Sequence, residues 1–273
     1  MAQCRVFNVA TSGYHRWVKT ADKRAERQAR VKQVDDRIKA AFWEHKQRSG
    51  ARRLYRHFAA NECPYSRRTI TKSLKKQGLR PKAAKKFKVT TNSKHSLPVA
   101  PNLLNRDFAA DRPNQKWCGD ITYIWTGEGW LYLAVLIDLY SRRVVGWSMS
   151  KRMTADLVCN ALRMALWHRG MPTGVMVHSD RGSQYCSKAY QKLITGNKLV
   201  CSMSRKGNCW DNAPAESFFH SLKVELIYDE LFATREEARK AIFEYIEVDY
   251  NRKRMHSYNG YLSPADFELK FAS

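Results

Sequence analysis

The sequence has no long hydrophobic run and no paired cysteines. Its longest apolar run, residues 130–137, is followed by Asp138 and is far shorter than the ~20 residues that a membrane-spanning helix needs. The N-terminus has no continuous hydrophobic segment of the signal-peptide kind. The seven cysteines are an odd number without a C-x-x-C pair, which favours reduced thiols in the cytoplasm over a disulfide framework. We therefore expect a soluble cytoplasmic protein.

Acidic residues are also scarce, and their distribution is uneven. The 273 residues include 49 Lys and Arg against 25 Asp and Glu, a net charge of +24. Residues 1–106 hold 27 of the basic and 6 of the acidic residues, whereas residues 107–273 hold 22 and 19. Clustered Lys and Arg are typical of nucleic-acid binding, because they displace counterions from phosphates; a ribosome-like extension or an ordinary basic surface is the alternative. The hydrophobic content of 44% excludes a disordered chain.

The basic N-terminal part is predicted to be helical. Residues 14–47 predict a long polar helix with little apolar face, which we interpret as lying on DNA or pairing with another subunit. Residues 51–60 and 67–77 predict two short helices, the second capped by Ser66 and ended by Gly78. Their tight connection favours a helix-turn-helix, although any short helical hairpin in a basic protein has the same pattern. The second helix carries candidate DNA-binding residues: Arg67, Arg68, Lys72, Lys75 and Lys76.

A segment rich in Pro, Ser, Thr and Asn follows, which we interpret as a linker over residues 80–112. After it, the sequence pattern changes to predicted strands and helices. Strands are predicted at 116–125, 130–138, 142–149, 175–179 and 199–202, and helices at 154–168, 187–195, 213–227 and 235–250. Three consecutive strands followed by alternating strands and helices predict a mixed α/β sheet. The aromatic residues of the first two strands are interpreted as core rather than as base-stacking residues: Trp117, Trp125, Trp130, Tyr123 and Tyr132.

Three carboxylates occupy positions where they could carry chemistry. Asp120 lies inside the first strand, where a charge is costly unless a metal or a partner compensates it. Asp180 directly follows the strand at 175–179, at the strand end where α/β folds place ligands. Glu216 lies in the first turn of a helix that Asp211 or Asn212 can cap. Each acid alone also has an ordinary structural interpretation: a buried hydrogen-bonded acid, a turn residue and a helix N-terminal acid.

Four extended segments, in the right order, carry a family resemblance. They read W-C-G-D-I-T-Y-I, H-S-D-R-G-S-Q-Y, G-N-C-W-D-N-A-P-A-E-S-F-F-H-S-L-K and Y-N-R-K-R-M-H-S. The chain resembles the integrase-core DDE transposases, and among them the second-reading-frame (OrfB) subunit of the IS-three family of bacterial insertion sequences. The resemblance covers nearly the whole chain. It implies an RNase H-like α/β fold, with a mixed five-stranded sheet flanked by helices, after a small all-α, helix-turn-helix-like region. The expected domains are a basic DNA-binding region (1–79), the linker (80–112) and a catalytic core with C-terminal helices (113–273).

The resemblance further implies that Asp120, Asp180 and Glu216 form a catalytic, metal-binding triad. Three converging carboxylates cannot all stay ionised unless hard cations neutralise them, which suits Mg²⁺, with Mn²⁺ as a substitute. Two such ions can activate a water or a 3′-hydroxyl and stabilise the leaving 3′-oxygen. A zinc site is not expected, because Cys4 and Cys63 lie far apart without paired Cys or His spacing.

Further residues near these motifs are candidates for supporting roles. Lys223 follows Glu216 by seven residues, on the same helix face, and is expected to meet a DNA phosphate near the metals unless it is an ordinary exposed lysine. Arg252 and Arg254 form a basic cluster that either contacts DNA or belongs to a solvated terminus. His178 shares strand parity with Asp180, so it either lines the site or is a packed core histidine.

The resemblance therefore implies a transposase catalytic subunit. It would nick the ends of an insertion sequence and join the freed 3′-hydroxyl to another phosphodiester, without a covalent protein intermediate. The expected partners are double-stranded DNA (element ends and target), a second copy of the chain at least, and an upstream-frame OrfA subunit or its frameshift fusion; no membrane is involved. Such a protein is expected in the bacterial cytoplasm, at the nucleoid. The alternatives are an RNase H-like nuclease and a non-catalytic DNA-binding protein derived from a transposase.

Overall fold

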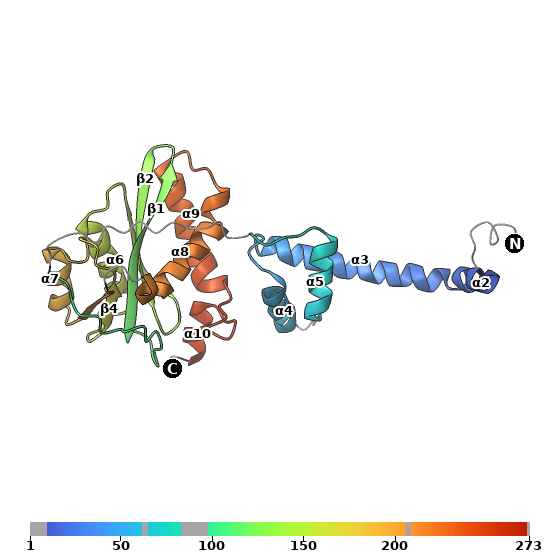
Figure 1. Cartoon of the computed structure of the whole chain (residues 1–273), viewed down its shortest axis with the longest axis horizontal. Coiled ribbons are helices and arrows are strands. Elements are labelled where there is room, and N and C mark those ends of the chain that lie inside the picture. Colours follow the sequence, from blue (N-terminus) through green and yellow to red (C-terminus); the bar gives the residue numbers. More distant parts are fainter. Residues whose placement is uncertain (1–9, 62–64, 83–97, 206–208, 272–273) are drawn as a thin grey trace. The chain divides into compact units, whose positions relative to one another are not determined.

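The computed structural model describes residues 10–61, 65–82, 98–205 and 209–271. The chain divides into two compact units, Met1–Ala83 and Ala84–Ser273, both drawn in Figure 1. Within the described ranges, no helix is long and apolar enough to cross a membrane.

The first unit consists of helices around a small apolar core. Its described helices are α2 (Thr11–Lys19), α3 (Ala21–Glu44), α4 (Ala51–Ala60) and α5 (Arg67–Lys76). Ser66 caps α5 by accepting a hydrogen bond from the Thr69 N–H at 3.0 Å, and Gly78 follows the helix with φ +66°. Because both signals act through neighbouring residues, the sequence located this helix correctly.

The long helix expected over residues 14–47 differs from the structure in two ways. It is interrupted at Thr20, between α2 and α3. The C-terminal part of α3 also buries Ile38 and Phe42 against Leu54 and Ile70 of the next two helices. The interpretation of residues 14–47 as having no core face was wrong, because Ile38 and Phe42 lie four residues apart and so share one helix face.

The second unit is built on one mixed five-stranded sheet. Its strands are β1 (Lys116–Thr126), β2 (Gly129–Asp138), β3 (Val144–Ser150), β4 (Met176–Ser179) and β5 (Val200–Met203). Their order is β3-β2-β1-β4-β5, so the first strand in sequence is central. The pairs β1–β2 and β2–β3 are antiparallel, whereas β4 and β5 continue the sheet in parallel with β1. The fold class expected from the sequence is confirmed.

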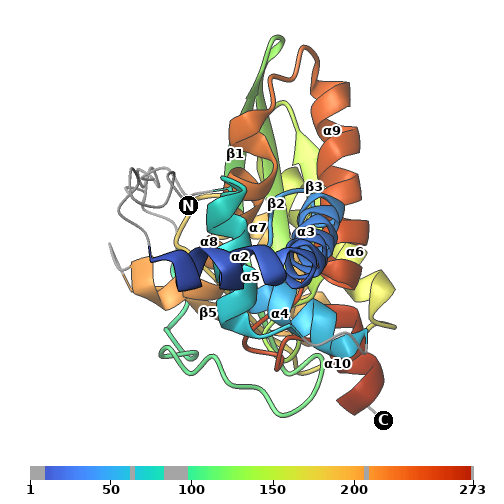
Figure 2. The same ribbon diagram turned by 90° about the vertical axis from the view of Figure 1, so that its right-hand side faces the viewer.

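Helices cover both faces of this sheet. They are α6 (Ala155–His168), α7 (Lys188–Gly196), α8 (Ala213–Glu225), α9 (Arg235–Glu244), the π-helical η3 (Tyr245–Lys253) and α10 (Pro264–Phe271). Leu133 and Val135 of β2 face the core formed with α8, α9 and η3, whereas Ala134 and Leu136 face the core formed with α6. This alternation is the period of two that a strand imposes. Figures 1 and 2 both show the β1–β2 hairpin beside α9, which packs on it.

The end of the β1–β2 hairpin departs from the sequence-based interpretation. Trp117 lies in the core as expected, but Trp125 and Trp130 are 61% and 43% exposed. The parallel pairing of β1 with β4 extends only over Lys116–Cys118 in the described register. The hairpin end buries Ile124 and Leu131 in the core but leaves Trp125 and Trp130 exposed, so these two tryptophans are not core residues.

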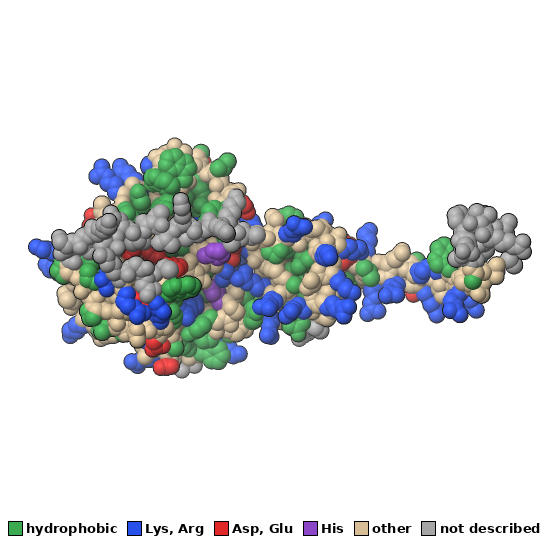
Figure 3. Space-filling view, in the orientation of Figure 1, with side chains coloured by type: hydrophobic (Ala, Val, Ile, Leu, Met, Phe, Trp, Pro, Cys, Tyr) green, Lys and Arg blue, Asp and Glu red, His purple; other side chains and the backbone are tan. Residues whose placement is uncertain are grey.

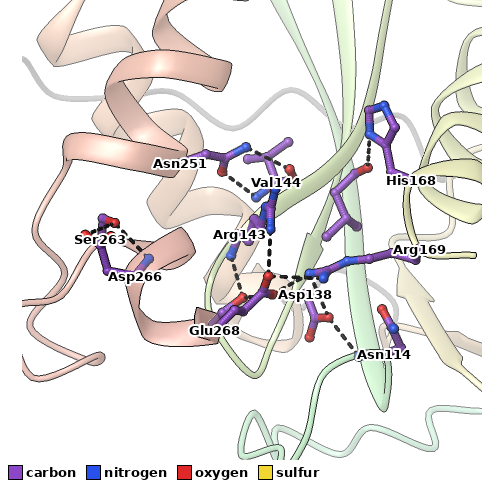
Figure 4. A network of polar contacts seen from close by, with 12 residues as sticks. Asn114, Asp138, Arg143, Val144, His168, Arg169, Asn251, Ser263, Asp266 and Glu268 are labelled. Carbon is purple, nitrogen blue, oxygen red and sulfur yellow. Dashed lines mark hydrogen bonds and ion pairs between the residues drawn. The ribbon is translucent and has the colours of Figure 1, made fainter. Parts of the chain in front are cut away.

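A network of polar contacts attaches α10 to the sheet (Figure 4). Ser141 Oγ and Arg143 Nη1 donate to the Glu268 carboxylate at 2.7 and 2.8 Å, and Arg169 forms an ion pair with the same group. Arg169 also contacts Asp138, at the end of β2, at 3.3 Å. The sequence did not indicate α10 as a separate helix, because its docking depends on this long-range network more than on an apolar stripe.

Candidate active site

The register of the sheet brings two of the three expected catalytic acids together. The parallel pairing of β1 and β4 includes the pair Cys118 and His178. Asp120 follows Cys118 by two residues, and Asp180 follows His178 by two residues. Adjacent strands lie about 4.8 Å apart, so the two aspartates occupy neighbouring positions where β4 ends.

The electrostatics of Asp120 connect it with the third acid. Burial raises the pKa of Asp120 well above its usual range, and the negative charges of Asp180 and Glu216 raise it further. The hydrogen bond from the Ile121 N–H, at 2.8 Å, and the positive charge of Lys223 act in the opposite direction. The negative charges of both other acids of the predicted triad therefore act on Asp120. The positive charges and hydrogen-bond donors around it do not balance the negative charge of its ionised form.

Glu216 and Asp180 are held by local backbone structure. Glu216 lies in the first turn of α8, which packs on β1, and burial raises its pKa. The Asp180 carboxylate accepts a hydrogen bond from the Gly182 N–H at 2.9 Å, within the turn that follows β4. Each acid is thus attached to a different element around the central strand.

The donor set of these acids fits a hard divalent cation. Carboxylate oxygens are the ligands that Mg²⁺ and Mn²⁺ prefer, and a nearby cation would reverse the rise in the pKa of Asp120. Over the described ranges, no group of three or more His, Cys, Asp and Glu side chains is arranged to hold a metal. The register therefore sets the backbones of Asp120 and Asp180 side by side, while the described side chains of the three acids do not form a ligand arrangement.

Comparisons with known proteins decide the family. Two models described as "Integrase core domain" match residues 110–209 and 216–270, and one described as "HTH-like domain" matches residues 29–87. The "Transposase InsF for insertion sequence IS3A" of Escherichia coli (strain K12) is 54% identical over 269 residues, covering 98% of this chain and 93% of the relative. The chain belongs to the transposases of the IS3 family of insertion sequences. The resemblance inferred from four sequence segments is confirmed.

Two further relatives support the membership and the fold. The "Insertion element IS600 uncharacterized 31 kDa protein" of Shigella sonnei is 46% identical over 268 residues, covering 98% of both chains. A chain of the simian T-cell lymphotropic virus intasome, solved in complex with PP2A regulatory subunit B56 gamma, matches with a TM-score of 0.50 at 19% identity. This match covers 65% of the transposase chain and 60% of the viral chain. At that identity it shows the shared fold alone.

Lys223 of the transposase is buried on α8 rather than exposed to solvent. It is 6% exposed, and its Nζ lies 5.3 Å from the centroid of the Tyr123 ring. Burial lowers the pKa of Lys223, while the charge of Asp120 partly offsets this effect. Its expected contact with a DNA phosphate stays a prediction, and its burial excludes the alternative of an ordinary exposed lysine.

The structure supports the core interpretation of His178. Its side chain is fully buried, with Nδ1 2.9 Å from Ser202 Oγ and Nε2 3.2 Å from Ser204 Oγ. Burial lowers the pKa of His178 to about 4. A neutral histidine between two serines ties β4 to β5 and the residues after it.

The predicted DNA-binding residues fall into two groups. On α5 all five basic residues are exposed, and Lys76 also forms an ion pair with Asp35 at 2.7 Å. Figure 3 shows Lys and Arg side chains over much of the visible face of this unit. Arg252 is exposed on η3, whereas the Arg254 guanidinium is bound to Glu225 of α8 at 2.8 Å. Contact of either group with DNA stays a prediction.

Sequence reasoning missed how the start of α8 is anchored. Asp211 does not serve as a helix cap: its buried carboxylate accepts hydrogen bonds from Arg106 Nε at 2.8 Å, Arg205 Nη2 at 2.8 Å and Asn102 Nδ2 at 3.0 Å. These partners, Arg205 above all, hold the pKa of Asp211 well below its usual range. Arg106 and Asn102 lie more than 100 residues before Asp211 in the sequence, so only the fold reveals the complete anchor.

Proposed function

We propose that Asp120, Asp180 and Glu216 are the catalytic carboxylates with which this transposase nicks the ends of its insertion sequence and joins the freed 3′-hydroxyl to another phosphodiester. The supporting observation is the β1–β4 register, which sets Asp120 beside Asp180 while the charge of Glu216 acts on Asp120. Acids in this arrangement resist simultaneous ionisation. That is the electrostatic condition under which a carboxylate cluster binds cations rather than remaining a set of separate surface acids.

The three carboxylates would hold Mg²⁺, with Mn²⁺ as a substitute. Such ions, when bound, lower the pKa of the attacking water or 3′-hydroxyl and stabilise the charge on the leaving 3′-oxygen. The chain itself supplies ionised oxygen ligands from Asp120, Asp180 and Glu216. Lys223 supplies a positive charge next to Asp120, which limits the repulsion between the acids and an approaching phosphate.

The substrate would be double-stranded DNA, at the element ends and at the target. The exposure of the basic residues of α5 and of Arg252 supports contact with phosphates. The basic region 1–79 would be the DNA-binding region that delivers DNA to the core at 113–273. Because two element ends must be held together for joining, the active form would contain at least two copies. An upstream-frame OrfA subunit, separate or fused by frameshifting, would be a further partner.

The decisive experiment compares two aspartates in a cleavage and joining assay with a labelled element end and the full chain. Asp180→Asn should abolish nicking and joining but keep DNA binding, because the amide cannot replace an anionic ligand. The matched control is Asp156→Asn, an exposed acid in the first turn of α6, which should retain both reactions. Joining by the Asp180→Asn protein would refute the triad. Hydrolysed products without joined ones, from the unaltered protein, would favour the nuclease instead.

A further inference from the structure

A polar contact connects the two elements that carry Asp120 and Glu216. Asn212 occupies the N-cap position of α8, yet its side chain makes no capping bond to the described part of the helix. Instead its Oδ1 accepts a hydrogen bond from Cys118 Sγ at 2.7 Å, and its Nδ2 donates to the Gly119 carbonyl at 3.2 Å. An N-cap asparagine ordinarily accepts an N–H of its own helix. This one is directed at the central strand.

Cys118 is fully buried in the core that β1 forms with α8. The same core contains Ala215, in the first turn of α8. We call the hydrogen bonds of Asn212 to Cys118 and Gly119 the Cys118–Asn212 clamp.

The two clamp residues precede Asp120 and Glu216 by spacings that keep them on the same face of their strand or helix. Asp120 follows Cys118 by two residues, and strand residues two apart share a face. Glu216 follows Asn212 by four residues, and helix residues four apart share a face. A shift of Asn212 relative to Cys118 would therefore be transmitted to the separation between Glu216 and Asp120.

We infer that Asn212, together with Cys118, is a positioning residue that sets the third carboxylate against the first. The inference rests on the proposed function for what the carboxylates do. Asn212 is 4% exposed, and its side-chain bonds go to β1. Its effect would pass through Glu216, so its loss should weaken cation binding more than it weakens the fold. Removing partners that orient metal ligands typically costs about 10–100-fold in metal affinity.

The test measures Mn²⁺ affinity of the full chain by calorimetry, together with thermal unfolding. The variants are Asn212→Ala, Cys118→Ala and Cys118→Ser. The matched control is Asn251→Ala: Asn251 is 2% exposed and bonds the N–H and carbonyl of Val144, each at 3.0 Å, from η3 to β3 (Figure 4). It has the same residue type, burial and strand-clamping geometry at another place in the sheet.

The expected pattern separates positioning from stability. Asn212→Ala should weaken Mn²⁺ binding about 10–100-fold, and Cys118→Ala should weaken it less, because the bond from Asn212 to the Gly119 carbonyl remains. The double variant should be no worse than Asn212→Ala, which already removes the bond to Cys118. Cys118→Ser keeps a donor and should retain most of the affinity. Asn251→Ala should lower the unfolding temperature and leave Mn²⁺ affinity unchanged.

Two results would overturn the inference: wild-type Mn²⁺ affinity in the Asn212→Ala protein, or no Mn²⁺ binding by the unaltered chain. Failure of the proposed function would look different. A chain whose Mn²⁺ affinity falls in the Asn212→Ala protein, but which joins no DNA even when unaltered, would refute the function and leave the clamp in place. Efficient joining together with unchanged Mn²⁺ affinity in the Asn212→Ala protein would refute the clamp and leave the proposed function in place.

Discussion

Replacing Glu225 by alanine should destabilise the second unit strongly. Arg254 Nε contacts both carboxylate oxygens of Glu225 at 3.0 Å, and Nη2 contacts Oε1 at 2.8 Å. Arg254 also donates to Ser221 Oγ at 2.8 Å, and the Tyr245 hydroxyl donates to Glu225 at 2.9 Å. The Arg254 and Glu225 side chains are 14% and 8% exposed. This ion pair links the end of α8 to the C-terminal end of η3.

The magnitude follows from the burial of the pair. Removing one partner of a buried ion pair costs about 3–5 kcal/mol, because the other charge stays buried without compensation. For a unit of about 150–250 residues, each kcal/mol lowers the unfolding temperature by about 2–4 °C. Glu225→Ala should therefore lower it by about 6–20 °C. Replacing both partners should cost less than the sum of the two single changes, because neither charge is left alone.

Circular dichroism during heating measures this effect, and DNA binding separates it from a surface role. Arg254→Ala should lower the unfolding temperature, whereas Arg252→Ala, an exposed neighbour on η3, should leave it unchanged. Fluorescence anisotropy with labelled DNA, recorded below both transitions, then shows which arginine contributes to affinity. A wild-type unfolding temperature in the Arg254→Ala or Glu225→Ala protein would refute the structural reasoning.

Three further outcomes are expected. Gly146→Ala should lower the free energy of unfolding by about 1–3 kcal/mol through overpacking, because the added Cβ would lie 2.7 Å from the Ala165 side chain of α6. The urea midpoint measures this change. It should stay unchanged in Gly196→Ala, where no described atom lies within 4 Å of the added Cβ. The lowered pKa of Asp211 contributes stability above the unfolded pKa of ~3.9 that is lost as the pH falls below it. The gap in unfolding temperature between wild type and Asp211→Asn should therefore close in acid, and a constant gap down to the lowest pH would contradict this. Arg67→Ala should reduce the slope of log DNA affinity against log salt by about 1; Lys76→Ala, already ion-paired, should change it less, and an unchanged slope in both variants would argue against α5 as a DNA contact.

The sequence by itself determined the local elements and the identity of the acids. Short apolar segments bounded by turn residues placed all five strands close to their observed positions, because strand-forming and turn-forming residues act locally. Ser66 and Gly78 marked the ends of α5 because capping acts within a few residues. The order of four segments and the residues within them identified the IS3 family and singled out Asp120, Asp180 and Glu216.

Only the tertiary structure decided how these parts meet. The parallel register of β1 and β4, which sets Asp120 beside Asp180, joins segments far apart in the chain, so no local pattern encodes it. The same limit explains why Asn212 looked like a helix cap and Arg254 like a surface arginine. Each of these polar side chains has a partner on another element, Cys118 for Asn212 and Glu225 for Arg254. Hydrogen bonds and ion pairs between distant residues leave no periodicity in the sequence, and they become visible only when the chain has folded.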